Sequence, residues 1–64
     1  MTAMFEEELR AQLAAAREDL AKAADDGDFD GVQACEGRIA GLLRLAASHG
    51  INLPHTPSEE RGNS

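Results

Sequence analysis

The chain has 64 residues and a hydrophobic fraction of 42%, but twelve of the hydrophobic residues are Ala and only two residues are aromatic. A core this small is marginal for one short chain, and it argues against an enzyme that acts alone through a deep pocket. Twelve Asp and Glu against six Lys and Arg give a net charge of −6. This acidity disfavours direct binding to nucleic acids and to anionic membranes.

The sequence favours a cytoplasmic protein. No run of apolar residues is long enough to cross a membrane, and Glu6 to Glu8 occupy the place where a secretory signal would need a basic and then an apolar region. The single cysteine, Cys35, cannot form an internal disulfide and fits a reducing compartment. The many Ala residues, with five Arg against one Lys, suggest a high-GC bacterial genome.

Residues 3–24 are predicted to form the first helix. They contain no Gly or Pro and consist mainly of strong helix formers. Apolar side chains recur at intervals of three or four, which is one stripe along a helix. The stripe consists of Phe5, Leu9, Leu13, Ala16, Leu20 and Ala23.

The acidic segment 25–28 is predicted to be a turn between two helices. Gly27 can take the positive φ that ends the first helix, and Asp28 can cap the N-terminus of the next. Residues 29–49 then form a second helix whose stripe has heptad-like spacing. The stripe consists of Val32, Cys35, Ile39, Leu42 and Ala46.

Two amphipathic helices joined by a short turn predict an all-α fold, an antiparallel, coiled-coil-like two-helix hairpin. Gly50 ends the second helix, and we expect residues 50–53 to fold back over the open end of the hairpin. The hairpin domain would thus span residues 1–53. Residues 54–64 have no large apolar side chain and are expected to be a disordered tail.

The second helix carries more leucines than one hairpin is expected to bury. We expect the surplus, Leu42, Leu43, Leu45, Ile51 and Leu53, to dock another protein. The occupant would be a second copy, completing a four-helix bundle as a homodimer, or a helix of a larger partner. The alternative is a lone hairpin in which Leu45 lies under the segment from Ile51 to Leu53. The expected function is that of a small interaction module without cofactors.

A divalent-cation site is the alternative function. Residues 26–31 read D-G-D-F-D-G and match the first half of an EF-hand calcium loop, with carboxylates at Asp26, Asp28 and Asp30. The twelfth position should be a bidentate Glu but is Gly37, and Glu36 comes one residue early. Helix capping explains the same acids without a metal.

The remaining reactive or unusual residues show no catalytic or zinc-binding spacing. Cys35 lies on the predicted inner stripe and is expected to be a small buried side chain. Gly37 and Gly41 form a G-x-x-x-G pattern on the second helix. This pattern indicates either simple tolerance of Gly or a groove where a partner helix comes close.

Overall fold

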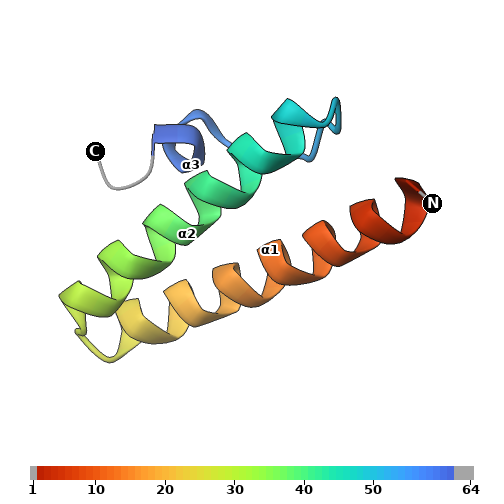
Figure 1. The fold of residues 1–64 in the computed structure, drawn as a ribbon. Coiled ribbons are helices and arrows are strands. Elements are labelled where there is room, and N and C mark those ends of the chain that lie inside the picture. The colour runs from red at the N-terminus through yellow and green to blue at the C-terminus, as the bar shows by residue number, and fades with distance from the viewer. Residues whose placement is uncertain (1, 62–64) are drawn as a thin grey trace.

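The computed structural model describes the backbone of residues 2–61 and the side chains of residues 4–61. Within this range the chain is all-helical, with α1 at Thr2–Asp25, α2 at Phe29–Ser48 and α3 at Pro57–Arg61. The two long helices pack against each other as an antiparallel hairpin, and the short α3 lies against α2 (Figure 1). The expectation of an all-α fold with two packed helices is confirmed.

Asp28 takes part in both helix ends at the turn, through its N–H at the end of α1 and its carboxylate at the start of α2. The N–H groups of Gly27 and Asp28 donate to the carbonyls of Ala24 and Ala23, and Gly27 has a φ of +71°. This is a Schellman stop for α1. The Asp28 carboxylate then accepts from the Gly31 N–H at 3.0 Å and caps α2. The expected roles of Gly27 and Asp28 are therefore confirmed.

The hairpin is narrow at the turn and wide at its open end (Figure 1). Near the turn the contacts are between small residues, and a Cβ added to Gly31 would lie 3.2 Å from the Ala23 Cβ. Towards the open end large side chains fill the space, and Phe5 stacks edge-on against His49 with ring centroids 4.8 Å apart. The buried cluster consists of Leu9, Leu13, Ala16, Ile39, Leu42, Leu43, Ala46 and Leu53.

A second Schellman stop ends α2 and returns the chain to the core. Gly50 has a φ of +74°, its N–H donates to Ala47, and the Ile51 N–H donates to Ala46 at 2.8 Å. Ile51 packs partly buried against the core, and Leu53 is only 2% exposed. The segment after Gly50 therefore returns to the hairpin, and Leu53 is a core residue.

The expectation of a disordered tail from residue 54 is wrong for residues 57–61, which form α3. The physical reason is a capping box with Pro at the first helical position. The Glu59 N–H donates to the Thr56 hydroxyl at 3.3 Å, and the Thr56 N–H donates to the Glu59 carboxylate at 3.0 Å. Residues 62–64 of the expected tail lie outside the described residues.

Candidate interaction surfaces

The structure divides the five predicted interaction residues into two groups. Leu42, Leu43 and Leu53 are buried in the core of the single chain, so they are not a free docking surface. This corrects the sequence-based assignment. One physical reason is a third layer, in which Leu43 lines a recess together with His55 and Glu60. The sequence analysis foresaw the fold-back of residues 50–53 but not the packing of the residues that follow. Leu45 is 42% exposed and Ile51 is partly buried.

The segment 51–61 covers only one of the two faces of the hairpin. Leu53 and Pro54 lie over Leu13 and Arg17 of α1, while His55 lies over α2. Successive side chains are 100° apart around a helix axis. On each helix, the residues that point neither to the core nor to segment 51–61 therefore lie on the opposite side of the hairpin. We call this opposite side the open face. It carries Glu8, Gln12 and Asp19 from α1, and Arg38, Gly41 and Leu45 from α2.

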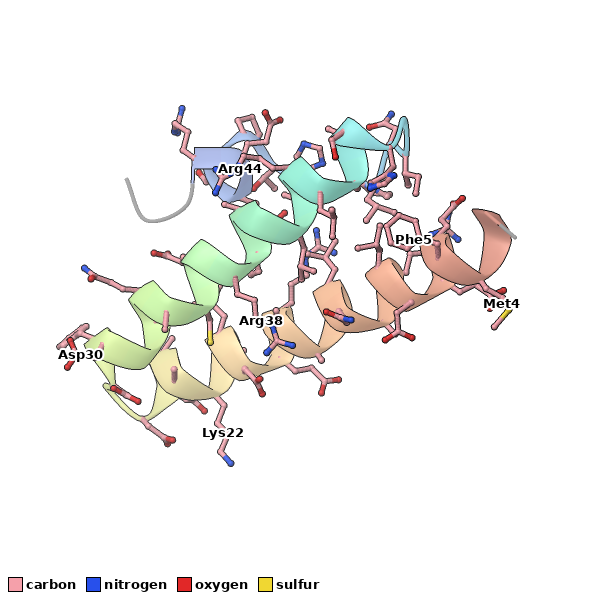
Figure 2. The ribbon with its side chains drawn as sticks, in the orientation of Figure 1. Met4, Phe5, Lys22, Asp30, Arg38 and Arg44 are labelled. Carbon is pink, nitrogen blue, oxygen red and sulfur yellow. The ribbon has the colours of Figure 1, made fainter. Side chains whose placement is uncertain are left out.

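The open face is polar on α1 and mixed on α2. On α1 the Gln12 amide donates to the Glu8 carboxylate at 3.2 Å. On α2 Leu45 is exposed, and the position where a Cβ of Gly41 would lie has no atom within 4 Å. Arg38 extends on the side of α2 turned towards α1, whereas Arg44 lies beside α3 (Figure 2). On the open face, the α1 flank is therefore acidic, and the α2 flank carries Arg38 and Leu45.

An ion pair ties α3 back to α1. The Arg17 Nε lies 2.8 Å from Oε2 of Glu59 and the Arg17 Nη2 lies 3.0 Å from Oε1, a two-point contact. The same Nη2 donates to the Pro54 carbonyl at 2.8 Å. The guanidinium holds the pKa of the Glu59 carboxyl below its usual value, and the carboxylate raises the pKa of Arg17. We call Arg17, Glu59 and the Pro54 carbonyl the clasp.

His55 bridges two acceptors within the same segment. Its Nδ1 lies 2.5 Å from the Leu53 carbonyl oxygen and its Nε2 lies 2.7 Å from Oε2 of Glu60. The hydrogen bond to the carbonyl, and then the one to Glu60, raise the pKa of the imidazole above its usual value. The ring lies in a recess lined by Ala40, Leu43, Arg44, Ala47 and Glu60.

The acidic turn gives no support to the calcium alternative. Among residues 2–61, no three His, Cys, Asp or Glu side chains come together in a way that could hold a metal ion. Of the proposed ligands Asp26, Asp28, Asp30 and Glu36, the second is already the N-cap of α2. Glu36 instead lines a shallow recess beside Leu20, under α3.

Cys35 is a free thiol of intermediate exposure, so it is less buried than the sequence analysis expected. It lies in the narrow part of the hairpin, where small side chains leave it partly uncovered. Neither Gly37 nor Gly41 has an atom within 4 Å of the position of an added Cβ. The two glycines are therefore not required by any contact within the chain.

Sequence reasoning missed the clasp and the role of His55. In the sequence, nothing distinguishes Arg17 from the other cations of the first helix. The run Thr56-Pro57-Ser58-Glu59 nevertheless carried a signal, since Thr, Pro and Glu at these spacings are typical of a helix start. A helix start four residues after a buried leucine indicates that the chain continues to pack rather than to leave the surface.

No family model, no curated protein and no solved structure matches the chain. Over the described residues, none of the three helices combines the length and the apolar character needed to cross a bilayer. The arguments about function therefore rest on the geometry of this chain alone.

Proposed function

We propose that the protein is a small protein–protein interaction module that associates with a second copy of itself through the open face. The observation that carries this proposal is Leu45, a large aliphatic side chain that is 42% exposed in the last turn of α2, on the open face. Met4 and Phe29 are also large exposed side chains among the described residues. Met4 lies near the start of α1 and Phe29 is the first residue of α2, at the turn, so they lie at opposite ends of the hairpin.

Charge complementarity favours a second copy as the occupant. Two hairpins stacked on their open faces about an axis parallel to the helices would bring α1 of one against α2 of the other. Glu8 and Asp19 would then lie opposite the flank that carries Arg38. Attraction between these flanks sets the orientation, while burial of Leu45 supplies the affinity. The result is a four-helix bundle of ordinary type.

Gly41 gives the open face a shape that suits the proposed dimer. Because no atom lies within 4 Å of the position of its missing Cβ, it leaves a notch one turn away from Leu45. In the stacking described above, Gly41 would face α1 of the second copy, and its missing side chain would let that helix approach closely. The open face as a whole is then self-complementary, as a symmetric dimer requires, since the α1 flank of each copy meets the α2 flank of the other.

Light scattering across protein concentration tests the proposal. The chain has no Trp or Tyr, so concentration must be followed by refractive index. We expect the wild-type mass to rise towards twice the 6.8 kDa of one chain. Leu45→Glu should hold the mass at one chain, because a carboxylate would be buried at the contact. A wild-type protein of one-chain mass at every concentration would contradict the proposal.

Phe29→Glu is the matched control. Phe29 is 80% exposed, so this substitution also replaces a large apolar side chain with a carboxylate, but at the turn and off the open face. It should leave the association unchanged. Equal loss of association in both variants would indicate a response to net charge rather than to the open face.

A further inference from the structure

We propose that residues 55–61 form a proton-dependent latch, closed on the hairpin while the His55 ring carries both of its protons and released when the ring loses one. This inference concerns the face opposite to the open face, and it does not depend on self-association. It rests on which groups surround His55, on how the latch is attached and on what it covers.

The first argument is the chemistry of the two partners of His55. The Leu53 carbonyl oxygen and the Glu60 carboxylate both accept hydrogen bonds, and neither donates when the carboxyl is ionised. Nδ1 and Nε2 lie 2.5 and 2.7 Å from these oxygens. A neutral imidazole has only one N–H, so it would leave one nitrogen lone pair facing an oxygen. Only the imidazolium can therefore donate to both oxygens in the closed geometry.

The second argument is the set of charges that face the ring. From its own segment His55 faces Glu60, with Glu59 further away, and both favour the charged ring. From α2 Arg44 lines the same recess. From α1 Arg17 reaches the Pro54 carbonyl and Glu59, where its charge is balanced within the clasp. The hydrogen bonds to the Leu53 carbonyl and to Glu60, with the charges of both acids, outweigh the desolvation that opposes the charged ring, so the pKa of His55 is raised.

The third argument is the apolar surface under the latch. His55 and Glu60 line a recess together with Ala40, Leu43 and Ala47 of α2, and Ala40 and Leu43 are buried. Loss of the His55 bridge removes the hydrogen bonds that join Leu53 and Glu60 through the imidazole ring. Release would then uncover an apolar strip on α2 while the Schellman stop at Gly50 keeps the hairpin intact.

The direction of the pH effect follows from the two titrating ends of the latch. The pKa of His55 is raised, so the stability that its charged ring gives to the latch is fully present below the ordinary imidazole pKa of about 6.5. That stability is lost as the pH rises through the higher pKa of the folded protein. The pKa of Glu59 is lowered, so the stability that its carboxylate gives to the latch is present above the usual carboxyl pKa. That stability is lost as the pH falls through the lower pKa of the folded protein. The latch is closed between these limits.

NMR of the labelled protein from about pH 5 to about pH 8.5 tests this inference. We expect the His55 ring to titrate with a midpoint above about 6.5. As the pH passes this midpoint, the Cα chemical shifts of residues 57–61 should change from helical towards random-coil values. The Cα chemical shifts of α1 and α2 should stay constant. A His55 midpoint at or below about 6.5, or α3 shifts that do not change through it, would overturn the latch.

The two histidines provide matched variants. His55→Gln cannot carry the second proton, so the α3 shifts should become independent of pH across this range. His49→Gln, at the end of α2, should keep the transition. Glu60→Gln should move the His55 midpoint down, because the ring loses a carboxylate partner. If His55→Gln keeps the wild-type transition, another group controls α3 and the inference fails.

Discussion

Arg17 and Glu59 form a two-point ion pair between α1 and α3, although 42 positions separate them in the sequence. Glu59 also closes the capping box with Thr56, so one carboxylate both starts α3 and fastens it to the hairpin. The side chains of Arg17 and Glu59 are 40% and 20% exposed. The pair is therefore partly shielded from water, unlike an ordinary surface pair.

Removal of the charge at either end of this pair should weaken the fold modestly. We expect Arg17→Gln and Glu59→Gln each to lower the free energy of unfolding by about 1 kcal/mol, near the upper end for exposed pairs because the contact has two points. Denaturant titration followed by circular dichroism measures this. The double variant should lose less free energy of unfolding than the sum of the losses in the two single variants.

Arg10→Gln is the control for that prediction. Arg10 and Glu6 are one helical turn apart, with 2.6 Å between Nη2 and Oε2, and their side chains are 61% and 37% exposed. We expect a loss of about 0.3 kcal/mol, typical of a pair within one helix. A larger effect at Arg10 than at Arg17 would show that α3 is not held by the clasp.

Two glycines of α2 should respond to Ala in opposite directions. A Cβ at position 31 would lie 2.5 Å from Oδ2 of Asp28 and 3.2 Å from the Ala23 Cβ, so the cap must move and the helices must separate. Gly31→Ala should destabilise by about 1 kcal/mol, the usual cost of a lost cap. Gly37 has open space, and Gly37→Ala should stabilise by about 0.5–1 kcal/mol. Thermal unfolding of both variants checks the signs.

Leu53 should behave as a core residue and Leu45 as a surface residue. Leu53 is 2% exposed, so Leu53→Ala should cost about 2–4 kcal/mol. Leu45→Ala should cost less than about 1 kcal/mol when measured at concentrations where the chain is monomeric. Chemical denaturation with both variants decides the matter. Equal costs would mean that the segment after Gly50 does not pack on the hairpin.

Calcium should not bind at the acidic turn. Asp28 is engaged as the N-cap of α2, and the described residues bring no three potential ligands together. Millimolar Ca²⁺ should therefore leave the thermal midpoint unchanged and release no heat in a calorimetric titration. A rise in the midpoint that is lost in Asp26→Asn and Asp30→Asn would establish the calcium alternative instead.

The hairpin could be predicted from the sequence because its signals are local. The three-and-four spacing from Phe5 to Ala23, the glycine at 27 and the cap at 28 each specify backbone geometry within a few residues. The stop at Gly50 is of the same kind. Small residues near the turn and large ones beyond it also match the narrow and wide ends of the hairpin.

The latch could not be predicted in the same way, because its contacts are long-range. Nothing near Arg17 in the sequence indicates that its partner is Glu59, and a tail without large apolar residues has the composition of a disordered segment. The tail is ordered by one buried leucine, an ion pair and a capping box. For that reason three of the five residues predicted to form an interface became core residues.

The central claim is that Leu53 packs inside its own chain and brings the latch onto the hairpin. Methyl NOE spectroscopy tests it most directly, in a sample that mixes two differently labelled populations of the protein. Our account predicts NOEs between the methyl groups of Leu53 and Leu13 within one chain, since both belong to the same buried cluster. Absence of these NOEs, or their appearance only between differently labelled chains, would contradict it.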